Sequence, residues 1–306
     1  MIPRIDCAAV IDPAHPDHAP MRARTAEAAG NVGFLTLFNT PLTPARVKEV
    51  IALYRAFFHL PAADKRAVDM SVTGSNRGWG AAGSEQVNPD ANPDYKQVFD
   101  CGISLLADHP LRRAGIPAYA PNLWPAQPAD FAPVLKAYFR DVCAVARDVL
   151  VAVLDAVGED GAFFADKFTT PMALLRGNFY PERPADAGAK DFGIATHTDY
   201  GCLTMLATDG SPGLEVRKRG GGWILVSAPP GEFIINFGEM LEIWTEGRIK
   251  ATPHRVIGTT AERISVPLFF NPDHDANVAP LGADPVRAVD HLQRRFDQTY
   301  LHLKKG

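Results

Sequence analysis

Hydrophobic positions follow two different periods along this chain, and the change falls near residue 170. Before that point apolar residues recur at helical spacing over 133–157, and Gly158 ends the run. Residues 70–130 are instead rich in Gly, Pro, Asn and Asp, which favours long irregular loops. The first part of the chain is therefore predicted to be mostly helical, with irregular connections.

Two shorter patterns refine this amino-terminal part. Thr43 followed by Pro44 is typical of a helix start, which predicts a helix through about Leu60. The apolar run VGFLTLFN at 32–39 predicts a buried strand, and a first helix is expected to end within 26–30. A little strand is thus expected among the helices.

Beyond residue 170 the pattern changes to short strands separated by turn residues. Eight segments carry it: ALLRGNFY, GIATH, CLTMLAT, GLEVRK, WILVSA, EFIINF, ATPHRVI and RISVPLFF. Crossover helices between them are missing, so a double-sheet jelly roll is favoured over a parallel sheet. One helical insert is expected at Glu239–Gly247, and the tail from Pro285 to about Leu303 again has helical spacing.

These elements predict an all-β core with flanking helices, a double-stranded β-helix of the jelly-roll, cupin-like type. We expect a mixed helical region at 1–170, a catalytic core at 171–275 and a helical tail at 276–306, joined in one structural unit. The length of 306 residues suffices for a substantial core.

Composition narrows the classes of function. The chain is 46% hydrophobic and 22% charged, with a net charge of −4 and a pI of about 6.1. These values indicate a globular protein without the overall basic charge typical of nucleic-acid binding. The cluster Arg217, Lys218 and Arg219 precedes three glycines and is interpreted as an exposed hairpin tip. We therefore expect no nucleic-acid partner.

Cysteine usage and the apolar runs indicate the compartment. The four cysteines are scattered without a CxxC pair, which disfavours a zinc finger and a disulfide scaffold. The amino terminus lacks the apolar stretch of a signal peptide, and no run reaches the roughly 18 apolar residues of a membrane span. A cytoplasmic protein without a membrane partner is expected, while no pattern indicates an oligomeric state.

The triplet His197-Thr198-Asp199, followed later by His254, is the first candidate for chemistry. Residues two apart on a strand face the same way, so His197 and Asp199 can both point into a barrel. Two imidazoles and one carboxylate are the set that holds ferrous iron on one face and leaves three positions open. An iron site is therefore predicted.

The same triplet pattern occurs elsewhere and carries less weight there. His15-Pro16-Asp17 falls in a proline-rich segment interpreted as loop, and His274 between two aspartates is interpreted as a turn. An HxD triplet arises often by chance. The prediction at His197 depends on its combination with His254 and with the pair described next.

Arg263 and Ser265 follow the second histidine and obey strand alternation. An arginine fork with a nearby hydroxyl suits a carboxylate, and a buried arginine without an anion would be costly. We expect a seat for an organic acid beside the metal. On another strand Arg176, Asn178 and Tyr180 alternate inward and offer hydrogen bonds to the same cavity, although ordinary core packing explains Asn178 and Tyr180 nearly as well.

These motifs, in this order, resemble the iron(II)- and 2-oxoglutarate-dependent oxygenases of the isopenicillin N synthase-like family. The similarity covers nearly the whole chain. Its segments are IPRID, NVGFLTLFN, FFHLPAADK, NRGWG, YKQVFDCG, NFYP, HTDYGCLTML, PGLEV, FIINFGEMLEIWTEGR, TPHRV and RISVPLFFNP.

The resemblance implies a role for each matching position. His197, Asp199 and His254 would ligate Fe(II), and 2-oxoglutarate would chelate the metal. Arg263 and Ser265 would hold the distal carboxylate of 2-oxoglutarate, with Tyr180 and Asn178 assisting. Two departures are small: Glu239 stands where the family usually has aspartate, and Ala251 where serine is common.

The reaction implied by the resemblance uses dioxygen to convert 2-oxoglutarate into succinate and CO₂, coupled to hydroxylation, desaturation or cyclisation of a small organic substrate. Two alternatives stay open: an iron oxidase of the isopenicillin N synthase type that does not use 2-oxoglutarate, and a non-catalytic ligand-binding barrel. Candidate substrate residues are Arg77, Lys96, Phe99, Arg176 and Phe270, of which Lys96 and Arg77 could select an acidic substrate.

Overall fold

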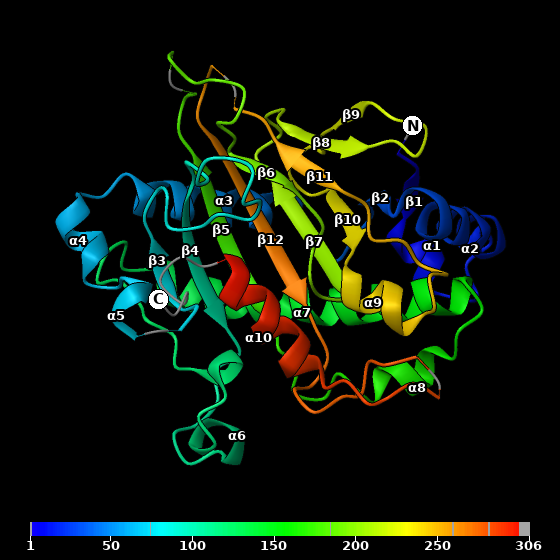
Figure 1. Ribbon diagram of the computed structural model, residues 1–306. Helices are drawn as coiled ribbons and strands as arrows, with labels where there is room; N and C mark the ends of the chain where they lie inside the picture. The colour runs from blue at the N-terminus through cyan, green and yellow to red at the C-terminus, as the bar shows by residue number, and fades with distance from the viewer. Residues whose placement is uncertain (1, 74, 184, 259, 281, 300–306) are drawn as a thin grey trace.

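Two facing β-sheets form the core of the computed structural model, which describes residues 2–73, 75–183, 185–258, 260–280 and 282–299 (Figure 1). The major sheet has eight strands, in the order β1 (Arg4–Asp6), β2 (Phe34–Phe38), β10 (Phe233–Phe237), β7 (Leu203–Thr208), β12 (Arg263–Phe270), β5 (Leu174–Tyr180), β4 (Gln97–Gly102) and β3 (Gly78–Gly80). The minor sheet has four, in the order β6 (Ile194–His197), β11 (His254–Val256), β8 (Leu214–Arg217) and β9 (Trp223–Val226).

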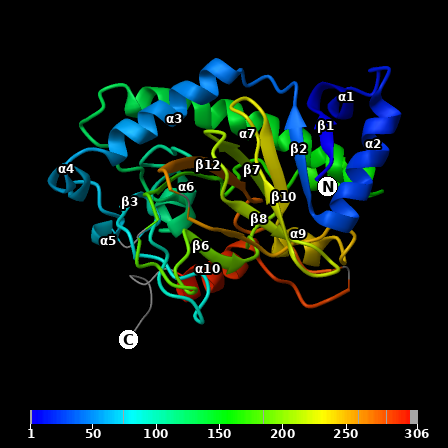
Figure 2. The same ribbon diagram turned by 90° about the horizontal axis from the view of Figure 1, so that it is seen from above.

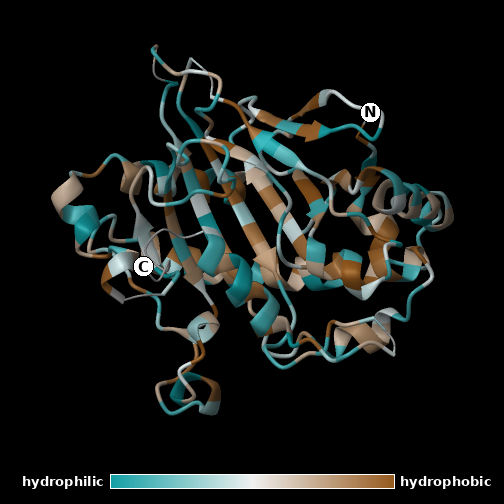
Figure 3. Ribbon diagram, in the orientation of Figure 1, coloured by the Kyte–Doolittle hydropathy of each residue, from teal (hydrophilic) through white to brown (hydrophobic). Residues whose placement is uncertain are grey.

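All eight strands expected after residue 170 are confirmed, and they build the expected jelly roll. Every pairing among them is antiparallel. Apolar and polar side chains alternate along several strands, which gives the banding seen in Figure 3. One face of the major sheet therefore lines the interior of the barrel, and the other face packs on helices.

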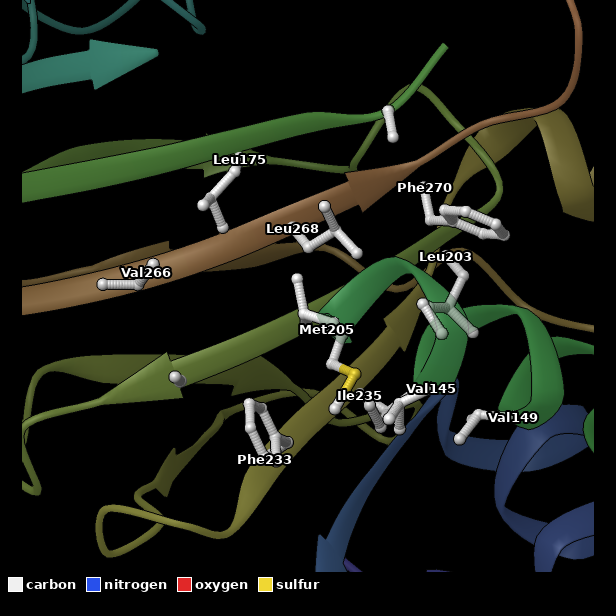
Figure 4. Close-up of a cluster of buried hydrophobic side chains, with 14 of the residues drawn as sticks. Val145, Val149, Leu175, Leu203, Met205, Phe233, Ile235, Val266, Leu268 and Phe270 are labelled. Carbon is white, nitrogen blue, oxygen red and sulfur yellow. The ribbon is translucent and has the colours of Figure 1, made fainter. Parts of the chain in front are cut away.

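Two long helices cover the outer face of the major sheet, as Figure 2 shows from above. α7 (Phe131–Ala156) and α3 (Pro44–Phe58) confirm the two expected helices, and the Thr43 hydroxyl accepts a hydrogen bond from the Arg46 amide as the cap of α3. The core between sheet and α7 includes Leu268, Phe270, Met205, Val145 and Val149 (Figure 4). Even-numbered residues of β12 thus point away from the barrel.

The remaining helices are shorter and lie around the sheets. The insert after β10 is confirmed as α9 (Glu239–Trp244), and the tail forms α10 (Ala288–Thr299). The part of the expected tail helix beyond Thr299 lies outside the described residues. The others are α1 (Cys7–Ile11), α2 (His18–Glu27), a π-helix (Ala28–Val32), α4 (Ala62–Arg66), α5 (Met70–Thr73), α6 (Pro110–Arg113), a 3₁₀ turn (Pro117–Tyr119) and α8 (Gly161–Ala165).

The expectation of irregular loops throughout 70–130 was wrong for one segment. β4 pairs with β5 from Gln97 to Gly102 and continues the major sheet, with β3 at its edge. Glycines and prolines on both sides hid this strand. The domain division at residue 170 stays a prediction, although the major sheet runs across it, because β2 pairs with β10 and β4 pairs with β5.

Two further observations concern the surface. Lys218 and Gly222 close the turn between β8 and β9, with Arg219 exposed beside them, as expected for a hairpin tip. Among the described residues, no helix combines the length and apolar character needed to cross a membrane.

Candidate metal centre and substrate cavity

Three potential metal ligands meet at the mouth of the barrel. His197 ends β6 and pairs directly with His254 of β11, so that their ring centroids lie 4.3 Å apart. Asp199 follows two residues later, and its Oδ1 lies 3.7 Å from Nε2 of each histidine. The three ligand atoms lie within 4.8 Å of one another. This spacing brings both imidazoles and one carboxylate oxygen around a single point.

Hydrogen bonds orient each of these side chains. Nδ1 of His197 lies 2.8 Å from the Ala195 carbonyl, and Nδ1 of His254 lies 3.1 Å from the Thr252 carbonyl. Since a carbonyl oxygen can only accept, each Nδ1 carries the proton and each Nε2 keeps its lone pair toward the shared point. Such support from outside the ligand set is typical of a metal site.

Two hydrogen bonds orient the Asp199 carboxylate through Oδ2, the oxygen that does not face the histidines. Oδ2 accepts hydrogen bonds from Thr204 Oγ1 at 2.5 Å and from Asn236 Nδ2 at 2.6 Å. Oδ1, which faces the histidines, is thereby left for a cation. Asn236 is the first residue of the NFGE segment, so that segment supports the metal site through its asparagine side chain.

The protonation states also favour a cation. Burial and the neighbouring His254 hold the pKa of His197 well below its ordinary value. Burial tends to raise the pKa of Asp199, but the two histidines and the bonds from Thr204 and Asn236 outweigh it and lower that pKa. A neutral His197 imidazole beside an ionised Asp199 carboxylate suits a divalent metal, because both groups then offer lone pairs. The donor set therefore fits ferrous iron.

A second polar group lies deeper in the barrel, on β12 and β5. Arg263 pairs with Tyr180 and Ser265 pairs with Asn178 across the two strands. Ser265 Oγ lies 3.3 Å from Asn178 Nδ2 and 3.5 Å from the Tyr180 hydroxyl, and the Arg263 guanidinium lies over the Tyr180 ring at 5.0 Å. All four side chains are buried. The structure thus brings together the residues that the sequence predicted for a carboxylate.

Arg263 itself is only partly satisfied. Its Nε donates to the Ser211 carbonyl at 3.3 Å, while its Nη1 is buried and has no hydrogen-bond partner among the described residues. Asn178 Oδ1 is likewise unpartnered within that part of the chain. A buried guanidinium without an anion is costly, so this arrangement suits an anionic ligand.

A cavity of about 150 Å³ adjoins His197 and Asp199. Residues of the major sheet and of α10 both line it. In Figure 1, α10 is drawn in front of the strands of the major sheet. The apolar side of the cavity includes Leu174, Phe269 and Leu292. The cavity reaches Asn178 at the inner end, which connects it to the carboxylate seat.

A cluster of five charged residues, here called the ionic wall, borders the cavity: Glu85, Lys96 and Arg176 line it, while Asp94 and Asp100 pair with those two cations from behind. Lys96 Nζ lies 2.7 Å from Glu85 Oε2 and 2.9 Å from Asp94 Oδ2. The Arg176 guanidinium donates two hydrogen bonds to the Asp100 carboxylate, at 2.8 and 2.7 Å, and one to Glu85 Oε2 at 3.0 Å. All five are buried. Burial tends to raise the pKa of Glu85, but Arg176 and Lys96 outweigh it and lower that pKa to about 2.

The substrate residues predicted from the sequence divide into two sets. Arg77, Lys96 and Arg176 line the cavity. Phe99 and Phe270 do not: Phe99 packs on Phe57 and Phe131, and Phe270 stacks on Phe168, both on the outer face of the major sheet. Those two expectations were wrong.

Strand parity explains part of this error. Phe270 has the opposite parity to Arg263 and Ser265 on the same strand, so alternation would have selected Phe269 and Asn271 instead, and both line the cavity. Glu85 and Asn76 were missed as cavity residues. They lie in an irregular segment, where no periodicity indicates a direction.

Side-chain contacts connect α10 to the segment that carries the proposed metal ligand Asp199. Glu239 Oε1 accepts from the Thr198 hydroxyl at 2.5 Å and from Arg295 Nη2 at 3.1 Å. The Tyr200 hydroxyl lies 2.5 Å from Thr299 Oγ1, and its ring lies under the Arg295 guanidinium at 4.4 Å. The helix that covers the cavity is therefore tied to the residues on both sides of Asp199.

Comparison with known proteins relates this arrangement to a family. The model of the 2OG-Fe(II) oxygenase superfamily matches residues 171–272, and that of the non-haem dioxygenase in morphine synthesis N-terminal matches residues 2–127. A 2-oxoglutarate-Fe(II) type oxidoreductase, hxnY, of Emericella nidulans is 33% identical over 80% of this chain and 75% of its own. Homoarginine-6-hydroxylase 2-ODD-233 of Oryza sativa subsp. japonica is 29% identical over 83% and 78%.

Solved structures agree in fold. A full-length Neurospora crassa protein in complex with alpha-KG superposes with a TM-score of 0.85 at 24% identity, covering 97% of this chain and 96% of that one. A putative 2OG-Fe(II) oxygenase family protein from Caulobacter crescentus gives 0.81 at 26% identity, covering 97% and 98%. JOX2 in complex with 2OG, Fe and JA gives 0.78 at 25% identity, covering 96% and 84%.

Proposed function

The chain belongs to the 2-oxoglutarate- and iron(II)-dependent oxygenases of the isopenicillin N synthase-like superfamily, and from that premise we propose which residues carry its activity. It is a dioxygenase that couples the oxidative decarboxylation of 2-oxoglutarate, giving succinate and CO₂, to oxidation of a small organic molecule. When bound, the iron supplies the activation of dioxygen. The protein supplies the ligands, the orientation of both organic reactants and a largely buried site.

We assign the iron to His197, Asp199 and His254. Their free Nε2 and Oδ1 atoms face one point, and the supporting bonds from Ala195, Thr252, Thr204 and Asn236 fix their direction. Three protein ligands leave positions open for a bidentate cosubstrate.

We assign the distal carboxylate of 2-oxoglutarate to Arg263, with Ser265, Tyr180 and Asn178 around it. The observation that carries this assignment is the buried Nη1 of Arg263, which lacks a partner among the described residues. A carboxylate there would satisfy the guanidinium and accept from the Ser265 and Tyr180 hydroxyls. Cations of the ionic wall are already paired with carboxylates, which favours Arg263 as the anion seat.

The substrate is a small molecule, seated in the cavity beside His197 and Asp199 and covered by α10. Structures of similar proteins hold thymine or JA, which supports a ligand of that size range. The cytoplasmic location, the absence of a nucleic-acid partner and the domain division stay proposals from the sequence. The two alternatives are not favoured, because relatives are named as 2-oxoglutarate-dependent enzymes and the anion seat is intact.

An anaerobic titration tests the iron assignment. Adding Fe(II) and then 2-oxoglutarate should give a metal-to-ligand charge-transfer absorbance in the visible, and admission of air should yield succinate. Asp199→Ala should give neither, while Asp275→Ala, a change at an exposed aspartate, should give both. An unchanged absorbance in Asp199→Ala would contradict the iron assignment.

A further inference from the structure

The ionic wall of the cavity is balanced in charge. Lys96 and Arg176 contribute two positive charges, and the nearby Arg77, which also lines the cavity, contributes a third. Glu85, which lines the cavity, and Asp94 and Asp100, which pair with its lining cations without lining it themselves, contribute three negative charges. Lys96 and Arg176 are each bonded to two carboxylates, so neither presents an isolated charge to a ligand.

The position of Arg77 completes this balance. Its guanidinium donates to the carbonyls of Asn76 at 2.7 Å and Ala118 at 2.6 Å. Burial raises the pKa of Asp100, and the charges of Arg176 and Arg77 oppose that rise, so Arg77 is electrostatically coupled to the same carboxylate. The expectation that Lys96 and Arg77 select an acidic substrate therefore loses its basis.

This cavity should bind a charged substrate weakly. Moving an ion from water into a buried cavity costs several kcal/mol unless a counter-charge and hydrogen bonds receive it. Carboxylate ligands would meet Glu85, and ammonium ligands would meet Lys96 and Arg176, at a wall whose charges are already paired. The Nη1 of Arg263, which is buried and has no hydrogen-bond partner among the described residues, belongs to the proposed 2-oxoglutarate seat.

The cavity also offers a specific hydrogen-bond position. Asn76 lines it and is 9% exposed, and its Oδ1 has no hydrogen-bond partner among the described residues. An unpaired buried amide oxygen favours a ligand that brings an N–H or O–H donor. Across the cavity Leu174, Phe269 and Leu292 offer an apolar surface.

We propose that the oxidised substrate is an uncharged molecule with one hydrogen-bond-donating edge and one apolar face, selected by the balanced ionic wall and Asn76. This rests on the proposed function, since it assumes that the cavity beside the iron ligands receives the substrate. The donor edge meets Asn76, and the apolar face lies on Leu174 and Phe269.

The test offers matched ligands to the iron- and 2-oxoglutarate-loaded enzyme. Each small apolar skeleton is supplied as the uncharged carboxamide, the carboxylate and the primary amine, and anaerobic binding is read from the change in the visible spectrum and from calorimetry. Among skeletons that bind, the carboxamide should bind about tenfold or more tightly than either charged form. A charged form that binds best, or the failure of every uncharged member to bind, overturns the proposal.

Charge-altering variants make the test independent of the skeleton. Glu85→Gln leaves the wall with one excess positive charge and should move the preference toward the carboxylate by about tenfold. Asn76→Asp adds a negative charge at a side chain whose Oδ1 has no hydrogen-bond partner among the described residues, and should move the preference toward the amine. Glu49→Gln, an exposed change of the same chemistry, should leave the preference unchanged.

The two proposals fail in different ways. The 2-oxoglutarate charge-transfer band should persist in Glu85→Gln and Asn76→Asp, which shows that each variant is folded and loaded. Loss of this band in the unsubstituted protein contradicts the proposed function. An unaltered ligand preference in both variants, with the band present, contradicts the charge-balance proposal alone.

Discussion

Thr204 Oγ1 lies 2.5 Å from Oδ2 of Asp199, on the side of the carboxylate that faces away from the two histidines. Thr204 comes from β7 of the major sheet, whereas Asp199 follows β6 of the minor sheet. This bond therefore joins the two sheets at the proposed iron site and sets the direction of the carboxylate.

Removing this hydroxyl should weaken iron binding. Thr204→Val keeps the shape of the side chain but removes one of the two hydrogen bonds that hold Asp199 Oδ2, the other coming from Asn236. Loss of such a supporting bond typically costs about 10- to 100-fold in metal affinity. An anaerobic Fe(II) titration in the presence of 2-oxoglutarate measures the change. Thr208→Val on the same strand removes a bond to the Ala228 carbonyl and serves as the control. Equal iron affinity in the two variants would contradict this role of Thr204.

Replacing Arg263 should impair the use of 2-oxoglutarate. Arg263→Met removes the proposed partner of the distal carboxylate, and loss of a buried charge partner amounts to about 100-fold in the KM for 2-oxoglutarate. Iron affinity should change much less, because Arg263 touches none of the three ligands. Succinate release measured against 2-oxoglutarate concentration provides the value. Arg217→Met, at an exposed strand position, should leave the KM unchanged.

Gly177 is expected to tolerate no side chain. A Cβ there would lie 2.2 Å from Cδ1 of Tyr54, which α3 presses against β5. Gly177→Ala should therefore lower the free energy of unfolding by about 1–3 kcal/mol through overpacking. Urea denaturation checks this value. Gly220→Ala, where no heavy atom lies within 4 Å of the added carbon, should change stability little. If Gly177→Ala loses no more stability than Gly220→Ala, the Tyr54 side chain must move to make room, and the prediction is wrong.

Arg295 should hold α10 closed over the cavity. Arg295→Met removes both the bond to Glu239 and the contact with the Tyr200 ring. Amide hydrogen exchange over 288–299 should then accelerate by up to about fivefold, the range of a part-exposed ion pair. Arg294→Met changes an exposed neighbour on the same helix and should leave the exchange unaltered. Succinate release without substrate oxidation should also rise in Arg295→Met.

The sequence indicated those features that depend on neighbours along the chain. Alternation within each strand selected His197 with Asp199 and Arg263 with Ser265, and a Thr-Pro pair located the start of α3. Local patterns of this kind do not depend on the rest of the fold, and here they were sufficient for the elements and for the directions of these side chains.

Features set by partners distant in sequence were missed. Lys96 does line the cavity, but its pairing with Glu85 was not predicted, because Glu85 lies in an irregular segment where no periodicity indicates the direction of its side chain. β4 was hidden among turn residues, and only its pairing with β5 places Phe99 on the outer face and Asp100 on the inner face. Phe270 is a different case, because no distant partner was needed to place it. The strand alternation used for Arg263 already predicts that Phe269, and not Phe270, points into the barrel.

The pairing of β2 with β10 and of β4 with β5 has a consequence for protein engineering. Strands from the first hundred residues protect two flanks of the catalytic sheet, and removing them would uncover β10 and β5 as bare edges open to association between molecules. The cavity-lining segments between these strands cannot be treated as a detachable module. Recombination between relatives should keep β2 and β4 and exchange only the connections between them.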